Sequence, residues 1–166
     1  MPILHLSLGS NLGQREQYLR VALQQLRLTY GLPVAVSDVY RTVAWGVEQQ
    51  PDFLNLVALY DTDVATERVL RTLHKIEAAA GRQRALRWGS RTLDIDILAH
   101  GERRIQTEQL TVPHPRLAER NFVLAPWTDV APDYHPPGQA GTVRELFAEG
   151  LDPLAVTHVG PLELIH

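Results

Sequence analysis

The feature of the sequence that most restricts the fold is the order of its strand-like and helix-like segments, which differ in the spacing of their apolar residues. Strand-like segments, with alternating apolar residues or short buried runs, are residues 2–8, 33–43, 53–61 and 92–100. Helix-like segments, with apolar residues three and four positions apart, are residues 14–30 and 65–80. A chain with this order of strand, helix, strand, strand, helix and strand can bury its apolar faces in one sheet that the helices cover.

This order predicts an α+β fold with a ferredoxin-like βαββαβ core, in which two helices pack on one face of an antiparallel sheet. Gly101 predicts a turn into a short hairpin partner at residues 103–106. The proline-punctuated remainder, from Leu110 onward, should wrap the sheet as C-terminal additions. We expect short helices there, one of them beginning at the capping box of Thr142 and Glu145. No linker is evident, so residues 1–166 are predicted to form a single domain.

Composition argues against several classes of protein. The net charge of −3 lacks the basic excess that nucleic-acid and membrane-surface binders show. The absence of cysteine fits a reducing compartment, so we expect a cytoplasmic protein. The first residues lack a basic region before an apolar run, and no apolar stretch approaches the ~20 residues that a membrane span needs. We therefore expect small-molecule substrates, a monomer, and neither nucleic acid nor membrane as a partner.

Two aspartates stand inside the fourth strand-like segment. Asp94 and Asp96 alternate with Ile95 and Ile97, so they share the face opposite the apolar one, roughly 7 Å apart along the backbone. A solvated strand face is the plainer interpretation of two such residues alone. However, aspartate is unfavourable in strands, and two carboxylates at this spacing can converge on one hard cation or on two ions ~3.5–4 Å apart. The pair therefore indicates a Mg²⁺ site.

An arginine-rich loop leads directly into this pair. Residues 81–91 contain Arg82, Arg84, Arg87 and Arg91 and no acidic residue. Any one of them is expected by default to be solvated or paired with an acid elsewhere. Four together favour phosphate binding, because guanidinium forks match phosphate oxygens and Mg²⁺ is often held by carboxylates plus substrate phosphates. Glycines at both ends of the loop suggest a lid, in which Trp88 is either a hinge aromatic or a cover over the substrate.

No Walker A motif occurs, so a nucleotide would bind without a P-loop. The glycines of residues 9–13 predict a strand-to-helix turn with Ser10 or Asn11 as the helix cap.

Aromatic and amide side chains suggest a pocket for a flat heterocycle. Asn55 follows Phe53 by two residues, so both should face the same side of their strand. Asn55 is either satisfied by a neighbouring backbone group or reads the polar edge of a ring on which Phe53 stacks. Phe122 is a second candidate ring, although a core position is the plainer interpretation.

His114 stands between two prolines in a rigid, extended segment. Alone, such a histidine is more often structural than functional. Together with Arg116 and Arg120, it can supply hydrogen-bond donors to phosphate.

Taken together, these motifs resemble the 6-hydroxymethyl-7,8-dihydropterin pyrophosphokinase family. The matching segments, in order, are LGSNLG, YRT…WG…QQPDFLN, IEAAAGRQR…RWGSRTLDIDIL and LTVPHPRLAERNFVL, which span residues 8–132. The resemblance implies a ferredoxin-like enzyme of folate biosynthesis. It would transfer the pyrophosphoryl group of ATP to the hydroxymethyl group of the pterin, release AMP, and use two Mg²⁺ ions.

The resemblance also implies roles for individual residues. Asp94 and Asp96 would hold both metal ions, and Arg82 and Arg91 would engage the phosphates during catalysis. The ATP site would be lined by Glu77, Arg84, Trp88, Ile97, Thr111, His114 and Arg120. The pterin edge would be contacted by Thr42, Trp45 and Asn55, and its ring would lie between Phe53 and Phe122. Asp96 would help accept the proton of the substrate hydroxyl, with a metal-bound water or a phosphate oxygen as the alternatives.

The sequence departs from the family pattern at three positions. Ala44 and Ser90 stand where the family usually has proline, and both changes loosen a loop because proline restricts φ. Gln109 stands where relatives can carry arginine.

Two other classes of function remain open on the residues alone. A non-catalytic ligand-binding module would explain the fold without the aspartate pair. A metal-dependent nuclease or phosphohydrolase would use paired aspartates and arginines, but would not need the aromatic pocket.

Overall fold

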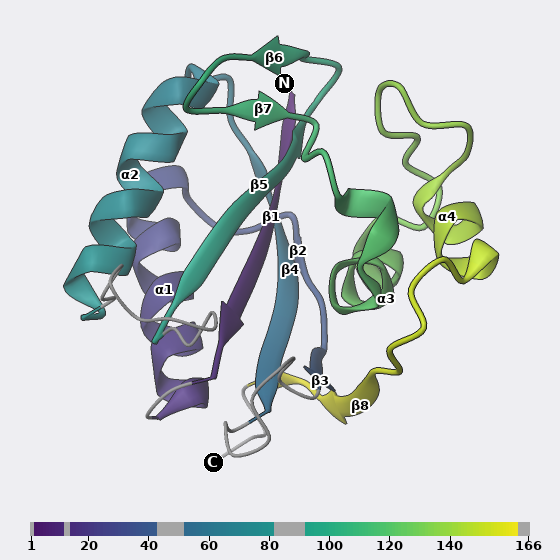
Figure 1. The fold of residues 1–166 in the computed structure, drawn as a ribbon. Coiled ribbons are helices and arrows are strands. Elements are labelled where there is room, and N and C mark those ends of the chain that lie inside the picture. The colour runs from purple at the N-terminus through teal and green to yellow at the C-terminus, as the bar shows by residue number, and fades with distance from the viewer. Residues whose placement is uncertain (1, 12–13, 43–51, 82–91, 163–166) are drawn as a thin grey trace.

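The computed structural model describes residues 2–11, 14–42, 52–81 and 92–162, and contains one main sheet with helices on both faces (Figure 1). The elements in chain order are β1 (Ile3–Ser10), α1 (Arg15–Tyr30), β2 (Ala35–Val36), β3 (Val39–Thr42), β4 (Phe53–Asp61), α2 (Thr66–Ala79), β5 (Asp94–His100), β6 (Ile105–Gln106), β7 (Thr111–Val112), a 3₁₀ turn (Leu117–Glu119), α3 (Asn121–Val130), α4 (Val143–Glu149) and β8 (Thr157–Gly160).

The sheet has the predicted ferredoxin-like topology. Its strand order is β5-β1-β4-β3-β8, with β2 also paired to β4, and every pair is antiparallel. The two strand–helix–strand units therefore interleave, with β1 and β4 side by side at the centre. The last strand, β8, extends the sheet beyond β3, at a place in the chain for which the sequence showed no pattern.

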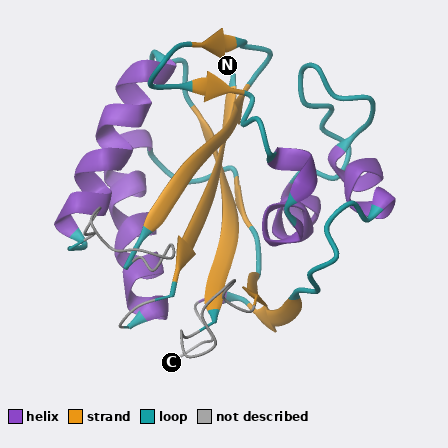
Figure 2. Cartoon of the chain, in the orientation of Figure 1, coloured by secondary structure: helices purple, strands orange, loops and turns teal. Residues whose placement is uncertain are grey.

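Helices lie on both faces of the sheet (Figure 2), and each face has its own apolar core. The first core includes Leu6, Leu56 and Ile95 and lies beneath α1 and α2. The second includes Val57 from β4 and Trp127 from α3, and lies beneath α3 and α4. The predicted pair of helices on one face is confirmed, and the C-terminal additions cover the opposite face.

Most predicted elements lie within two residues of the observed ones, and β4 agrees at both ends. The strand expected at residues 33–43 is instead divided into β2 and β3. Ser37 causes the break, because its hydroxyl accepts a hydrogen bond from the Val57 N–H and donates one to the Asp38 carbonyl. This side-chain pairing replaces part of the regular strand ladder.

The turn expected after residue 8 begins later than predicted. Gly9 and Ser10 continue β1, paired with Asn55 and Leu54 of β4. The Ser10 hydroxyl donates to the Thr92 carbonyl and caps no helix; α1 begins at Arg15 with Gln14 at the N-cap position. Ser10 therefore joins the end of β1 to the segment just before β5.

The capping box of α4 is confirmed, with Thr142 and Glu145 bonded reciprocally. No helix within the described ranges has both the length and the apolar character required to cross a membrane.

Candidate active site

A row of four residues crosses the sheet beneath α3. Asp94 of β5 pairs with Gly9 of β1, Gly9 pairs with Asn55 of β4, and Asn55 pairs with Tyr40 of β3. Directly paired residues point to the same side of a sheet. The Tyr40 hydroxyl donates to Asp129 of α3, so this side is the one that α3 covers. Asp94 and Asn55 thus share a face, separated only by a glycine.

Gly9 makes room for the side chain of Asn55. A Cβ atom at position 9 would lie 2.5 Å from Asn55 Oδ1, closer than side chains approach each other. The Asn55 carboxamide therefore lies over the backbone of β1, in the direction of β5. Any residue other than glycine at this position would displace it.

The amide nitrogen of Asn55 is a buried hydrogen-bond donor. Asn55 is 4% exposed, and its Nδ2 has no hydrogen-bond acceptor among the described residues. A buried donor without an acceptor costs free energy, and such groups in native structures are usually satisfied by a ligand, a water or a protein atom. This donor is suited to an acceptor on a bound molecule.

Two further predicted pterin contacts lie on the same face. Phe53 precedes Asn55 by two residues on β4 and pairs directly with Thr42 at the end of β3. Thr42 is buried, and Phe53 is half-buried. The sheet therefore brings Thr42, Phe53 and Asn55 together, as the alternation of β4 predicts for the last two.

The aspartates face away from the first core. Ile95 and Ile97 are buried beneath α1 and α2, whereas Asp94 and Asp96 are half-buried on the opposite side. Asp96 pairs with Ser7, one row along from Asp94 and Gly9. Both carboxylates consequently lie on the face that also carries Asn55.

Glu77 fixes the edge of β5 between the two aspartates. It is only 2% exposed on α2, and its Oε2 accepts a hydrogen bond of 2.8 Å from the Ile95 N–H. Glu77 is thus bonded to the backbone that carries the aspartate pair.

The donor set at the aspartates fits Mg²⁺. Within the described ranges, no three His, Cys, Asp or Glu residues are grouped as a metal-binding cluster. Mg²⁺ does not need one, because it is usually held by one or two carboxylates together with substrate phosphates and water. Asp94 and Asp96 supply hard oxygen ligands of this kind.

The segment after β7 brings His114 beside β5. The backbone N–H of His114 donates to the Leu98 carbonyl at 2.9 Å, and its Nδ1 accepts a hydrogen bond from the Arg116 N–H at 3.1 Å. Burial lowers the pKa of His114 to about 4; Arg120 and Arg116 act in the same direction and Asp94 opposes it. The ring is therefore neutral at pH 7, and because Nδ1 accepts, Nε2 carries the proton.

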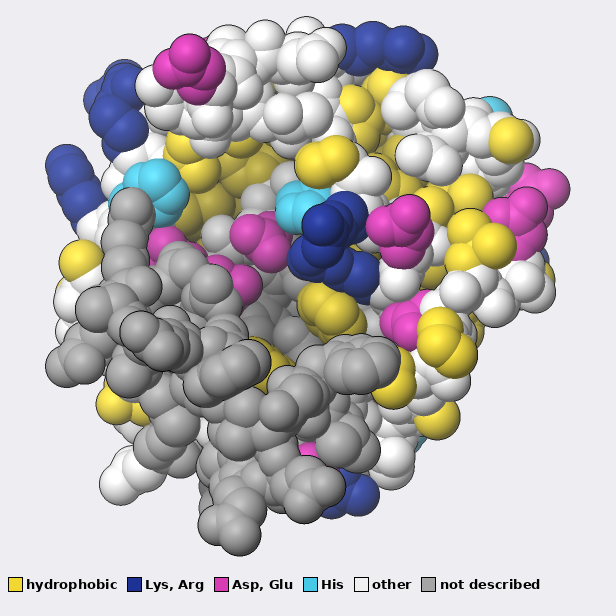
Figure 3. Space-filling model, in the orientation of Figure 1, with side chains coloured by type: hydrophobic (Ala, Val, Ile, Leu, Met, Phe, Trp, Pro, Cys, Tyr) yellow, Lys and Arg dark blue, Asp and Glu magenta, His cyan; other side chains and the backbone are white. Residues whose placement is uncertain are grey.

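Arg120 and Phe122 form a pair at the start of α3. The guanidinium carbon of Arg120 lies 5.4 Å from the centre of the Phe122 ring, in a cation–π contact. Arg120 and Asp94 both influence His114 electrostatically, so the three groups lie in one neighbourhood. Figure 3 shows acidic, histidine and basic side chains gathered at the centre of one face of the molecule.

Two predicted ATP contacts lie apart from this group. The side chain of Ile97 is 4% exposed within the first core, on the face opposite the aspartates. Thr111 is exposed on β7, where it pairs with Gln106. Five predicted residues, together with Ala44 and Ser90, lie outside the described residues: Trp45, Arg82, Arg84, Trp88 and Arg91.

Gly9 was not predicted from the sequence as part of the site. The residues from Leu4 to Ser10 belong to one strand, in which alternate side chains point to opposite faces. If this alternation is continued past Leu8, Gly9 lies on the face opposite Leu6 and Leu8. Only the register with β4 shows that it lies beneath Asn55.

Residues 5–132 match the family model for 7,8-dihydro-6-hydroxymethylpterin-pyrophosphokinase, abbreviated HPPK. The chain belongs to the HPPK family.

Curated relatives match over most of their own length. A 2-amino-4-hydroxy-6-hydroxymethyldihydropteridine pyrophosphokinase of Methylorubrum extorquens is 42% identical over 93% of this chain and 97% of its own. The enzyme of the same name from Bacillus subtilis is 44% identical over 77% of each chain. The HPPK match therefore rests on nearly the whole sequence rather than on isolated motifs.

Solved structures agree on the fold. The wild-type HPPK-DHPS of Plasmodium falciparum superposes with a TM-score of 0.69 at 17% identity, covering 89% of this chain and 44% of that longer one.

Proposed function

We propose that the chain transfers the pyrophosphoryl group of ATP to the hydroxymethyl group of 6-hydroxymethyl-7,8-dihydropterin, at the face described above. The enzyme is a diphosphotransferase of the HPPK family, and its reaction belongs to folate biosynthesis. The observation that best supports the site is the buried amide of Asn55, which lies on the same face as Asp94 and whose Nδ2 has no acceptor among the described residues. That face combines a donor for the edge of a heterocycle with ligands for a metal-bound polyphosphate.

The reaction is a displacement at the β-phosphorus of ATP. The hydroxyl oxygen of the pterin forms a bond to the β-phosphorus, and the bond from that phosphorus to the oxygen bridging the α- and β-phosphates breaks. AMP leaves with the bridging oxygen, and the hydroxyl proton passes to a base. Catalysis of such a transfer depends mainly on positioning and on neutralisation of charge.

The pterin would bind over β3, β4 and the start of α3. Asn55 Nδ2 would donate to a ring acceptor, and Thr42 would contact the same edge. Phe53 and Phe122 would enclose the ring face, since aromatic side chains stack on flat heterocycles. Trp45, outside the described residues, is proposed as a further contact, through its backbone.

The polyphosphate would lie between β5 and the segment leading into α3. Neutral His114 can donate through Nε2 to a phosphate oxygen, and Arg120 adds a charged donor. We propose Arg82 and Arg91 as the arginines that engage the phosphates during transfer, and Glu77, Arg84 and Trp88 as further residues of the ATP site. Ile97, whose side chain is buried in the first core, would contribute only its backbone, and Thr111 would contact ATP from β7, at the margin of the site.

Asp94 and Asp96 are the proposed ligands for two Mg²⁺ ions. Bound there, Mg²⁺ would neutralise phosphate charge and lower the pKa of a coordinated hydroxyl. Asp96 is the proposed acceptor of the hydroxyl proton. The monomeric state and the cytoplasmic location stay predictions.

A single assay of adenine products tests this function. The protein is incubated with ATP and Mg²⁺, with and without the pterin alcohol, and the nucleotides are separated by chromatography. We expect AMP in amounts equal to a new pterin diphosphate, and only when the pterin is present. ADP, or cleavage that does not need the pterin, would instead indicate a phosphohydrolase.

A further inference from the structure

The C-terminal tail, residues 150–162, runs from the end of α4 to β8 and beyond it (Figure 1). Near its beginning it is bonded to Asn121, the first residue of α3. Farther along, β8 pairs with β3. At its end, Leu162 is buried in the first core, and its carbonyl accepts a hydrogen bond from Arg20. The tail is therefore attached to both sides of the sheet.

Asp152 caps the start of α3. Its Oδ2 accepts a hydrogen bond of 2.8 Å from the Asn121 N–H, and its Oδ1 accepts one of 2.9 Å from the Leu154 N–H. The residue at the helix's own N-cap position is Arg120, which supplies no side-chain cap. Helix N-terminal N–H groups need an acceptor, and a carboxylate there also interacts favourably with the helix dipole. A residue 31 positions away in the sequence provides both.

Asn121 returns two hydrogen bonds to the tail. Its side-chain Nδ2 donates to the carbonyls of Asp152 at 3.2 Å and of Leu154 at 2.7 Å. Asn121 is thus held through its backbone and its side chain. Its neighbours in the chain are Arg120 and Phe122, which contact each other across it. Fixing Asn121 therefore restricts the direction of both side chains.

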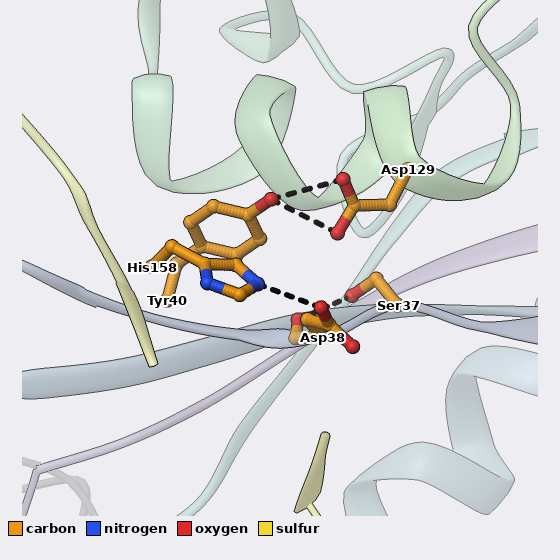
Figure 4. A network of polar contacts seen from close by, with 5 residues as sticks. All are labelled: Ser37, Asp38, Tyr40, Asp129 and His158. Carbon is orange, nitrogen blue, oxygen red and sulfur yellow. Dashed lines mark hydrogen bonds and ion pairs between the residues drawn. The ribbon is translucent and has the colours of Figure 1, made fainter. Parts of the chain in front are cut away.

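The other end of α3 is held separately (Figure 4). Tyr40 of β3 donates to both carboxylate oxygens of Asp129, each at 2.9 Å. His158 of β8 lies edge-on to the Tyr40 ring, with centroids 5.3 Å apart, and its Nε2 is 2.6 Å from Asp38 Oδ2. These contacts keep the C-terminal half of α3 on the sheet independently of Asp152, so loss of the Asp152 carboxylate should disturb mainly the first turn of the helix.

We propose that Asp152 is a positioning residue for the active site, which holds Arg120 and Phe122 in the orientation that binds ATP and the pterin. This inference rests on the proposed function, in which those two residues contact the substrates. It assigns to the tail a specific role in catalysis that goes beyond completing the sheet.

The test compares Asp152→Ala with Asp133→Ala. Asp133 is a matched surface aspartate, 86% exposed, whose ion pair with Arg144 lies away from Asn121. We expect Asp152→Ala to weaken binding of Mg²⁺·ATP, measured by calorimetry, about tenfold, because a charge-assisted cap and its backbone partners are lost together. Asp133→Ala should bind like the wild type. Asp152→Asn keeps one acceptor oxygen and should be intermediate, which provides a milder variant if the alanine variant folds poorly.

A double-mutant cycle separates positioning from a general loss of structure. If Asp152 acts through Arg120, its substitution should change nucleotide affinity much less in an Arg120→Ala background than in the wild type. An equal effect in both backgrounds, or wild-type affinity of Asp152→Ala, would overturn the proposal. Affinity is measured without turnover, so a wild-type protein that binds ATP but forms no AMP would count against the proposed function and not against this role.

Discussion

The position of the Asn55 side chain depends on the glycine paired with it, Gly9. Its carboxamide can lie over β1 only because position 9 has no side chain. The amide is buried and its Nδ2 has no acceptor in the described part of the chain, an arrangement that costs free energy unless a ligand supplies the acceptor.

Gly9→Ala should therefore impair pterin binding. The new methyl group would displace the Asn55 carboxamide, so we expect a higher KM for the pterin and a loss of about 1–3 kcal/mol in the free energy of unfolding from overpacking. Steady-state kinetics and urea denaturation measure the two effects.

The same substitution in an Asn55→Ala background is the control. There the methyl group meets no carboxamide, so Gly9→Ala should have little further effect. A full additional loss in that background would show that Gly9 acts through something other than Asn55.

Asp94→Asn and Asp96→Asn should remove turnover and leave the fold intact. Each replaces a hard anionic metal ligand by a neutral amide of the same shape, and we expect kcat to fall by at least about a hundredfold. Circular dichroism checks folding, and Glu149→Gln, at the exposed end of α4, is the control. Near-normal rates at saturating Mg²⁺ in either variant would contradict the metal assignment.

Individual elements show where local sequence rules decide structure and where they fail. The capping box of α4 follows from two residues three positions apart, and the structure contains it. The start of α3 follows no such local rule, since its capping carboxylate comes from a distant tail. The break between β2 and β3 likewise depends on a hydrogen bond from Ser37 to another strand.

Thr142→Ala should destabilise the protein without affecting the site. Loss of an N-cap hydroxyl typically costs about 1 kcal/mol, which corresponds to a Tm lowered by roughly 2–4 °C for a domain of this size. Thermal denaturation measures this change. Thr29→Ala, which removes an exposed hydroxyl in the last turn of α1, is the comparison and should have a smaller effect. Nucleotide affinity should be unchanged in both variants.

At the scale of the whole molecule, a buried histidine joins the sheet to the C-terminal additions. His5 of β1 is 2% exposed, its Nδ1 accepts a hydrogen bond of 2.9 Å from Trp127 Nε1 of α3, and its ring stacks on Tyr134. Burial, with a smaller effect of His100, lowers the pKa of His5 to about 3. The folded protein therefore keeps His5 neutral well below the pKa of about 6.5 expected in the unfolded chain.

Stability should consequently fall in acid. Above about pH 6.5, His5 is neutral in both the folded and the unfolded state, and its contribution to stability is complete. Between about pH 6.5 and 3, only the unfolded chain binds the proton. The free energy of unfolding therefore declines in this range by up to about 1.4 kcal/mol per pH unit as the pH falls. His114, with its pKa lowered to about 4, acts in the same direction.

Urea denaturation at several pH values measures this dependence. His5→Gln retains a hydrogen-bond acceptor and cannot titrate in this range, so it should reduce the slope by about one proton. His135→Gln, at an exposed position, serves as the comparison. An unchanged slope in His5→Gln would show that other groups cause the acid sensitivity.

Local sequence patterns were sufficient to predict most of the elements of the core, the fold class and the family. Strand and helix periods are local, so β4 could be predicted at both ends, and the alternation around Asp94 and Asp96 was sufficient to place both on the face opposite the core. The family motif added the reaction.

The contacts between residues far apart in the sequence became evident only from the packed structure. Gly9 lies beneath Asn55 because of strand register, His114 lies beside β5 because of one backbone hydrogen bond, and Asp152 caps α3 across 31 positions. These contacts depend on which segments pack together, and no local spacing encodes that. The free energy that selects them comes from burial of the two cores as a whole.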